Sequence, residues 1–124
     1  MKDFKNYTSP FSWRYGSDEM RVIWSEENKY KIWRKIWVEL ARAQYKQDLV
    51  SAEELSDLEK HQDEIDIERI WEIEKDVRHD VVAAIKEFAE KAKVGGGKIH
   101  LGATSMDISD NAETIRISES LGLV

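Results

Sequence analysis

Apolar side chains recur at three- and four-residue steps along residues 26 to about 49, and this periodicity constrains the fold more than any other feature. An α-helix has about 3.6 residues per turn, so such steps place side chains on one face. Trp33 and Trp37 fall on this apolar stripe, whereas Arg34 and most other charged residues fall on the opposite side. The pattern predicts an amphipathic helix whose two tryptophans pack in the core and do not serve a cofactor.

The rest of the chain leaves room for further helices, because residues that interrupt helices are scarce. Pro10 is the single proline, and three of the six glycines stand together at 95–97. Helix interiors tolerate both residue types badly. With 124 residues, of which 41% are apolar and 35% charged, the chain has the composition of one folded unit. We therefore predict an all-α fold, with an irregular N-terminal arm over residues 1–16 and a helical domain over residues 17–124.

Polar residues mark where the helices are expected to begin. Ser17 is a plausible cap for a short helix, and Ser25 for the helix that starts at residue 26. Ser51 with Glu54 matches a capping box, and Asp66 is expected to cap a further short helix. A helix over residues 80 to about 92 should stop at the glycine run 95–97. A last helix should begin between residues 105 and 109 and run to the C-terminus.

The distribution of charge argues against a nucleic-acid partner. The formal net charge is −6, and basic residues alternate with acidic ones throughout the chain. No basic stripe is available to follow a phosphate backbone, so DNA and RNA are poor candidate partners. A small anionic ligand remains compatible with this charge, because a few arginines act locally.

Residue types exclude several other classes of site. The absence of cysteine excludes a disulfide framework, a thiolate metal site and a cysteine nucleophile. The three histidines, His61, His79 and His100, lack metal-ligand spacing, which argues against a zinc site. The N-terminus has no apolar core like that of a signal peptide, and no apolar run approaches the ~20 residues of a membrane-spanning helix. These features point to the cytoplasm and away from a membrane.

Arg14 and Tyr15 form the first of three segments with side chains suited to binding an anion. The planar guanidinium of Arg14 matches the oxygens of a phosphate or carboxylate. Tyr15 adds a hydroxyl group and a face for stacking. The alternative is a surface turn whose aromatic residues hold the arm against the body of the protein.

Arg78, His79 and Asp80 form the second segment, at the expected start of a helix. An arginine there would act together with the helix-end amides in attracting an anion. His79 could donate a hydrogen bond or transfer a proton near neutral pH. Asp80 could orient the histidine, cap the helix or accept a hydrogen bond from a substrate hydroxyl. The alternative is a capped helix end with a local salt bridge.

Thr104 and Ser105 lie in the third segment, residues 100–107. They place two hydroxyl groups and backbone amides at a helix N-terminus, where a carboxylate or phosphate could bind. Gly102 permits close approach of the backbone to a ligand. The alternative is that the Thr-Ser pair caps the helix and does nothing else.

Four separated segments resemble the adenylosuccinate lyase family in both order and spacing. They are Ser-Pro-x-x-x-Arg-Tyr at 9–15, Trp-Arg at 33–34, Arg-His-Asp-Val at 78–81, and Ile-His-Leu-Gly-Ala-Thr-Ser at 99–105 followed by Asp-Asn at 110–111. The last stretch is typical of the fumarase/aspartase superfamily, and Arg-His-Asp-Val narrows the resemblance to this member. The resemblance extends along nearly the whole chain.

The resemblance implies a reaction and an architecture. The family eliminates fumarate from adenylosuccinate to leave AMP, and it cleaves the succinylcarboxamide intermediate of purine synthesis (SAICAR) to AICAR. No metal or organic cofactor is implied. The chain would correspond to roughly the first quarter of such an enzyme, its all-α domain 1. In the family, long central helices form a homotetramer whose active sites each draw on three subunits.

The resemblance also assigns residues of this chain to substrate binding. They are Arg14, Tyr15, Arg78, His79, Asp80, Thr104 and Ser105. The first two match positions that contact the nucleotide, and the Thr-Ser pair matches one that binds the succinyl part. We assign His79 to binding and orientation, and no residue of this chain to catalysis. The family's acid/base histidine and its serine-rich mobile loop lie in segments that do not occur here, so we expect the chain alone to be inactive.

Two other functions are weighed against the lyase fragment. One is a small free-standing helical enzyme, such as a chorismate-mutase-like protein, which would also bind a dicarboxylate through arginines. The His-Leu-Gly-Ala-Thr-Ser segment argues against it, and an assay of chorismate turnover would separate the two. The other is a non-enzymatic helical module that binds partners through exposed apolar surface. Saturable binding of AMP or adenylosuccinate would favour the lyase over such a module.

Overall fold

The computed structural model describes residues 4–124, which form helices joined by short connections. In chain order the helices are α1 (Pro10–Trp13), α2 (Asp18–Ile23), α3 (Glu26–Tyr45), α4 (Ala52–His61), α5 (Ile67–Val77), α6 (Asp80–Lys91), the 3-10 helix η1 (Gly96–Lys98) and α7 (Ser105–Leu123). No strand occurs between residues 4 and 124, so the all-α prediction is confirmed. The first three residues of the predicted arm lie outside the described range.

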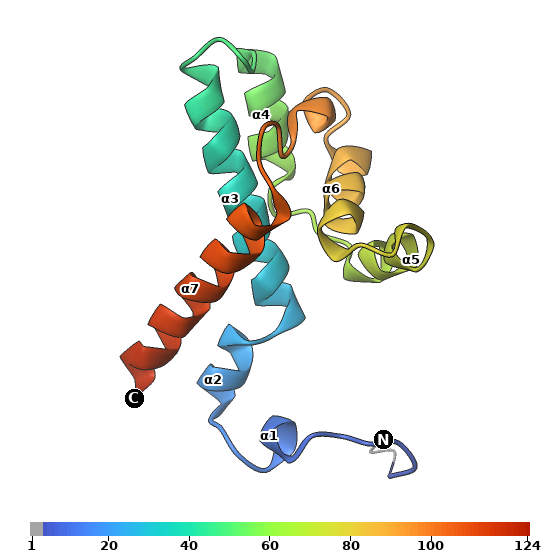
Figure 1. Cartoon of the computed structure of the whole chain (residues 1–124), viewed down its shortest axis with the longest axis vertical. Helices are drawn as coiled ribbons and strands as arrows, with labels where there is room; N and C mark the ends of the chain where they lie inside the picture. The colour runs from blue at the N-terminus through green and yellow to red at the C-terminus, as the bar shows by residue number, and fades with distance from the viewer. Residues whose placement is uncertain (1–3) are drawn as a thin grey trace.

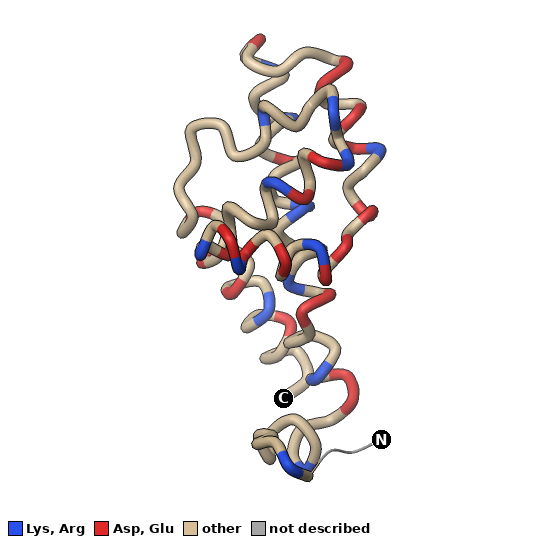
Figure 2. Tube along the Cα trace, turned by 90° about the vertical axis from the view of Figure 1, so that its right-hand side faces the viewer, with Lys and Arg blue, Asp and Glu red and all other residues tan. Residues whose placement is uncertain are grey.

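Figure 1 shows how the helices are arranged. Helices α3 and α4 run antiparallel, and α5 and α6 pack against each other beside them. Helix α7 crosses α3 and then extends alongside α2. Acidic and basic residues are interspersed along the part of the trace that the structure describes (Figure 2). None of the helices described is long and apolar enough to span a membrane.

Most helix starts lie where the capping residues predicted them. Ser17 Oγ accepts a hydrogen bond from Met20 N at 3.2 Å at the start of α2. Ser25 caps α3, Asp66 caps α5, and the capping box at the start of α4 is present. Helix α3 ends at Tyr45, earlier than predicted, because the chain turns there and Asp48 adopts a left-handed φ of 58°. Local hydrogen bonding thus defines the beginnings of helices better than apolar periodicity defines their ends.

The predicted irregular arm contains one helical turn, α1. Pro10 occupies its first position, where the missing backbone N–H leaves no hydrogen bond unmade. Ser9 Oγ accepts from Phe11 N at 3.3 Å and caps the turn. The prolyl residue that indicated a break in the sequence therefore begins a short helix.

The core forms where α3 meets α4, α6 and α7. Trp33 and Trp37 are 3% and 1% exposed, which confirms their prediction as core residues. Their rings meet edge to face at 6.1 Å, and Trp37 also packs against Phe88 of α6. A row of packed aromatic rings therefore links α3 to α6, the helix at whose start the second predicted binding segment lies.

Arg34 was predicted on the solvent side of α3, and this prediction is wrong. Its side chain is 2% exposed and forms an ion pair with the fully buried Glu87 of α6. The guanidinium also donates to the carbonyl oxygens of His61 at 2.8 Å and Glu64 at 3.1 Å. The second carboxylate oxygen of Glu87 accepts from Asp66 N at 3.2 Å. The pair thus connects α3, the loop before α5, and α6.

Gly95 packs against α4 too closely to admit a side chain. A Cβ atom at this position would lie 2.5 Å from Glu54 O and 2.8 Å from Leu58 Cγ. The carboxylate of Asp57 holds the backbone there, because it accepts from Val94 N at 2.8 Å and Gly95 N at 2.9 Å. The glycine run was predicted to stop α6, but α6 ends at Lys91 and the run forms η1. Gly95 is needed for the close approach of η1 to α4.

Gly95→Ala is therefore expected to destabilise the protein by about 1–3 kcal/mol, the usual cost of overpacking. Urea denaturation followed by circular dichroism would measure the change. Gly97→Ala is the matched control, because a Cβ there meets no atom within 4 Å. Equal losses in the two variants would contradict the packing explanation.

Candidate functional site

Two of the three predicted binding segments meet where α6 and α7 begin. His79 is the N-cap of α6, and Ser105 is the first residue of α7. The Nε2 atom of His79 lies 3.5 Å from Ser105 Oγ. Because each helix carries a partial positive charge at its N-terminus, the convergence of the two starts favours a bound anion.

The cap of α6 determines how His79 presents its ring. Its Nδ1 accepts a hydrogen bond from Val82 N at 3.3 Å, so in the neutral ring the proton is on Nε2. That N–H faces Ser105. The carboxylate of Asp80 lies 3.6 Å from Nδ1 and accepts from Val81 N at 2.7 Å. The His79 and Asp80 side chains are 45% and 55% exposed, so both are accessible to a ligand.

Arg78 forms the turn between α5 and α6. Its backbone has a left-handed φ of 54°, and its N–H donates to Glu74 O at 2.7 Å. Residues other than glycine seldom adopt this conformation, and such strain is concentrated at functional sites. Arg78 is exposed, and no carboxylate within residues 4–124 forms a salt bridge with its guanidinium. The guanidinium is therefore available to an anionic ligand.

Asp107 supports the backbone of the third segment. Its carboxylate accepts from Thr104 N at 2.9 Å, which fixes the turn that leads into α7. Gly102 has a φ of 73°, and a Cβ there would meet no atom within 4 Å, so the backbone at this glycine is open to a ligand. A cleft of about 390 Å³ lies between this loop and α3. The residues that line it are Ile36, Leu40, Gln44, Leu101, Gly102, Ala103, Asp107, Ile108 and Asn111.

His100 also belongs to this region, although no role was predicted for it from the sequence. Trp37 Nε1 donates to His100 Nδ1 at 3.0 Å. Partial burial lowers the pKa of His100, and so does the neighbouring His79, while Asp107 acts in the opposite direction. Burial of the ring therefore favours the neutral form of His100. Only the fold reveals this contact, because Trp37 precedes His100 by 63 positions.

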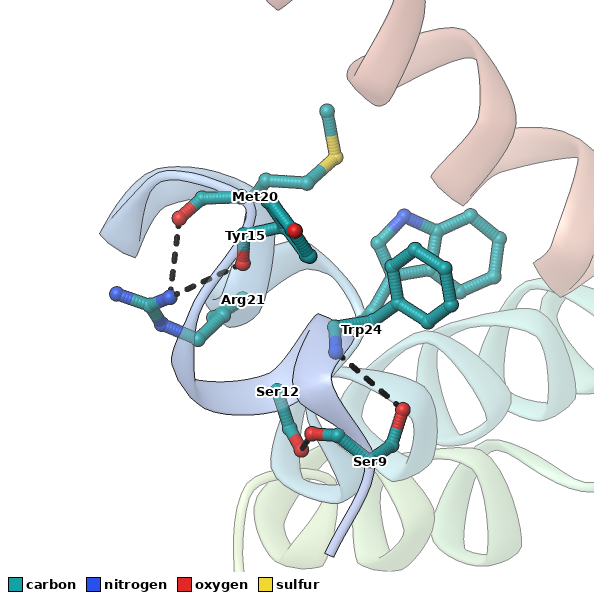
Figure 3. Close-up of a pocket in the computed structure, with 8 residues that line it drawn as sticks. Ser9, Ser12, Tyr15, Met20, Arg21 and Trp24 are labelled. Atoms are coloured by element: carbon teal, nitrogen blue, oxygen red, sulfur yellow. Dashed lines mark hydrogen bonds between the residues drawn. The ribbon is translucent and has the colours of Figure 1, made fainter.

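Arg14 and Tyr15 lie apart from the other two segments. Figure 1 places the arm beyond the far end of α2, away from the start of α7. Arg14 stacks over Trp13, with its guanidinium carbon 4.6 Å from the ring centroid. Tyr15 lines a pocket of about 570 Å³ between the arm and α2, together with Arg21 and Trp24 (Figure 3). Within this chain, the first predicted segment does not join the site at His79.

Among residues 4–124, no three histidine, cysteine, aspartate or glutamate side chains are grouped to hold a metal ion. His79 and Ser105 offer hydrogen-bonding groups beside the N-termini of α6 and α7.

Known proteins are similar in sequence to this chain along all or nearly all of its length. It is 39% identical over 128 residues to adenylosuccinate lyase of Saccharomyces cerevisiae, a match that covers 100% of this chain and 27% of the yeast protein. It is 41% identical over 118 residues to adenylosuccinate lyase of Methanocaldococcus jannaschii, covering 93% of this chain and 26% of the relative. By sequence, the chain is a homologue of the N-terminal part of adenylosuccinate lyase. The resemblance predicted from four short segments is confirmed.

The similarity to adenylosuccinate lyases is broad. The enzyme of Schistosoma mansoni is 33% identical over 125 residues, which cover 100% of this chain and 26% of the relative. The chain thus spans about a quarter of the length of the adenylosuccinate lyases that it matches. No protein-family model matches the chain. These three relatives are all adenylosuccinate lyases by name.

Proposed function

We propose that this chain supplies the substrate-binding part of an adenylosuccinate lyase, which eliminates fumarate from adenylosuccinate to leave AMP and cleaves SAICAR to AICAR. The whole-chain similarity to such lyases supports the reaction. The observation that carries the assignment of the site is the approach of His79 Nε2 to Ser105 Oγ at 3.5 Å. These two residues lie 26 positions apart in sequence, and the segments that carry them, each suited to binding an anion, thereby form one surface.

The side chains around His79 match the groups of the substrate. Adenylosuccinate carries a phosphate and two carboxylates, all of which accept hydrogen bonds. Arg78 offers a guanidinium that can bind a carboxylate or phosphate through two hydrogen bonds. Thr104 and Ser105 offer hydroxyl groups, for which we propose the succinyl part as ligand. His79 donates through Nε2 and orients the substrate, and Asp80 accepts from a substrate hydroxyl.

Arg14 and Tyr15 are proposed to contact the nucleotide in a site shared between subunits. Their position beyond α2, away from the start of α6, supports sharing, because one chain does not bring both segments to one ligand in this arrangement. Exposed apolar residues of α7 support the proposed homotetramer, since assembly would bury them. They are Met106, Ile115, Ile117, Leu121 and Leu123.

Within this proposal, residues 17–124 are domain 1 of the lyase, and residues 1–16 are its arm. The reaction requires proton transfer and charge stabilisation by side chains, without a metal or organic cofactor. Purine biosynthesis in the cytoplasm is the proposed setting.

In the longer enzyme that contains this chain, Arg78→Ala or His79→Ala is expected to reduce kcat/KM at least ~10-fold. Charged hydrogen-bond anchors contribute about 1.5–3 kcal/mol, and truncation removes that contribution. Steady-state kinetics of fumarate release from adenylosuccinate would measure the change in kcat/KM. Lys86→Ala is the control, because Lys86 is an exposed residue of α6, the helix that His79 caps. This variant should leave kcat/KM unchanged. The assigned roles would be refuted if Arg78→Ala and His79→Ala had the same kcat/KM as the control.

A further inference from the structure

Trp37 holds its indole N–H in a fixed position deep in the core. The side chain is 1% exposed, and its ring is wedged between Trp33, at 6.1 Å edge to face, and Phe88, at 6.4 Å. The ring of His100 meets it edge on, with centroids 6.1 Å apart and planes at 81°. Because dense packing prevents the indole from turning, its N–H is a rigid hydrogen-bond donor.

The hydrogen bond from Trp37 determines where His100 carries its proton. An indole N–H can only donate, so His100 Nδ1, 3.0 Å away, must accept. In the neutral ring the proton then lies on Nε2. A second proton would place an N–H on Nδ1 against the N–H of Trp37, and the bond would be lost. The contact therefore selects both the neutral ring and one of its two tautomers.

The surroundings of His100 connect it to the candidate site. His79, at the start of α6, and Asp107, in the first turn of α7, are the charged or titratable groups that interact with His100. Helix α3 contributes the uncharged Trp37. The backbone of His100 has a left-handed φ of 67°, a conformation that the surrounding structure must stabilise. His100 is thus held at the site by its backbone, its ring partner and its burial.

We propose that Trp37 is a positioning residue, which fixes His100 in the tautomer with the proton on Nε2 and so makes His100 a hydrogen-bond donor to a carboxylate or phosphate. The donor role rests on the proposed function, whereas the fixed tautomer is a property of the chain without ligand. The two parts can therefore be tested separately.

The test is a pH titration of the ligand-free chain, followed by ¹⁵N–¹H NMR of the histidine and tryptophan rings. We expect the neutral His100 ring to carry its proton on Nε2. The indole N–H signal of Trp37 should shift with the same midpoint as His100, because protonation of the imidazole breaks the bond between them. The indole signal of Trp33 is the internal control and should not follow His100. A Trp37 signal that is independent of His100 would overturn the proposal.

Trp37→Phe removes the donor and keeps an aromatic ring in the core. The bond stabilises neutral His100, so its loss should raise the pKa of His100 by about half a unit to one unit and allow the second tautomer. Trp71→Phe, at an exposed position on α5, is the control and should change neither the pKa nor the tautomer of His100. If His100 kept the same pKa and the same tautomer in Trp37→Phe, the proposal would also be overturned. If Trp37→Phe does not fold, the titration of the Trp37 indole in the unaltered chain decides.

Addition of adenylosuccinate to the same sample tests the donor role. The Nε2–H signal of His100 should move saturably with ligand. If the tautomer is fixed but this signal does not respond while other residues of the site do, the donor role is overturned and the proposed function stands. If no residue of the site responds, the proposed function fails and the fixed tautomer stands.

Discussion

Glu87→Ala is expected to lower the free energy of unfolding by about 3–5 kcal/mol, because it leaves a buried charge without its partner. Arg34 is 2% exposed and cannot reach water when the carboxylate is removed. The carbonyl oxygens of His61 and Glu64 and the face of Phe88, 3.8 Å from the guanidinium carbon, remain beside it. The carboxylates of Glu64 and Asp63 act on the guanidinium without forming an ion pair with it. None of these neutralises the charge. The loss is a large fraction of the stability of a typical domain.

Urea denaturation of Glu87→Ala and Glu90→Ala would measure this difference. Glu90 lies on the same helix and pairs with Arg69 at 2.8 Å, but both side chains are 45% exposed. Solvent screens such a pair, so its removal should change stability little. Replacement of both Arg34 and Glu87 by methionine should cost much less than Glu87→Ala, because no charge is left buried. Similar losses for Glu87→Ala and Glu90→Ala would contradict the account of the buried pair.

The buried pair also matters for the candidate site. Glu87 lies on α6, the helix that His79 caps, and Arg34 fixes that helix against α3. Trp37, one turn further along α3, donates to His100. Loss of Glu87 should therefore disturb the approach of His79 to Ser105 as well as global stability.

The 124-residue chain by itself is expected to release no fumarate from adenylosuccinate. The elimination needs a base for the Cβ proton and an acid for the leaving nitrogen. In this structure the Nδ1 atom of His79 is occupied by the cap of α6, and Nε2 faces Ser105. The family's acid/base histidine and serine-rich loop have no counterpart in this sequence. The chain should therefore bind the substrate without converting it.

Incubation of the purified chain with adenylosuccinate, followed by chromatographic detection of fumarate and AMP, would check this expectation. The His79→Ala chain is the control for contaminating lyase, because trace enzyme from the expression host would give equal product in both samples. Turnover that disappears in His79→Ala would show that this chain contains the catalytic groups after all.

Features that depend on neighbouring residues could be predicted from the sequence. Ser25 and Asp66 cap their helices as expected, since a cap is formed by atoms within four residues of each other. The apolar stripe of α3 correctly placed Trp33 and Trp37 in the core. The arm was an exception, because the same proline that interrupts a helix also suits the first position of one, at α1.

Features that depend on distant residues could not be predicted. Arg34 was placed on the solvent side because a periodic pattern treats every charge as exposed, whereas its partner Glu87 lies 53 positions away. The contact between Trp37 and His100 spans 63 positions and has no local signal. The proximity of His79 to Ser105 arises in the same way, from the packing of α6 and α7 about α3. Only motif resemblance linked these segments before the fold was known.

The most direct test of the central claim is a titration of the ¹⁵N-labelled chain with adenylosuccinate, followed residue by residue by NMR. The account predicts saturable shifts at Arg78, His79 and Ser105, with fumarate absent from the sample at the end. Shifts that fail to saturate, or saturable shifts confined to residues remote from the starts of α6 and α7, would contradict it.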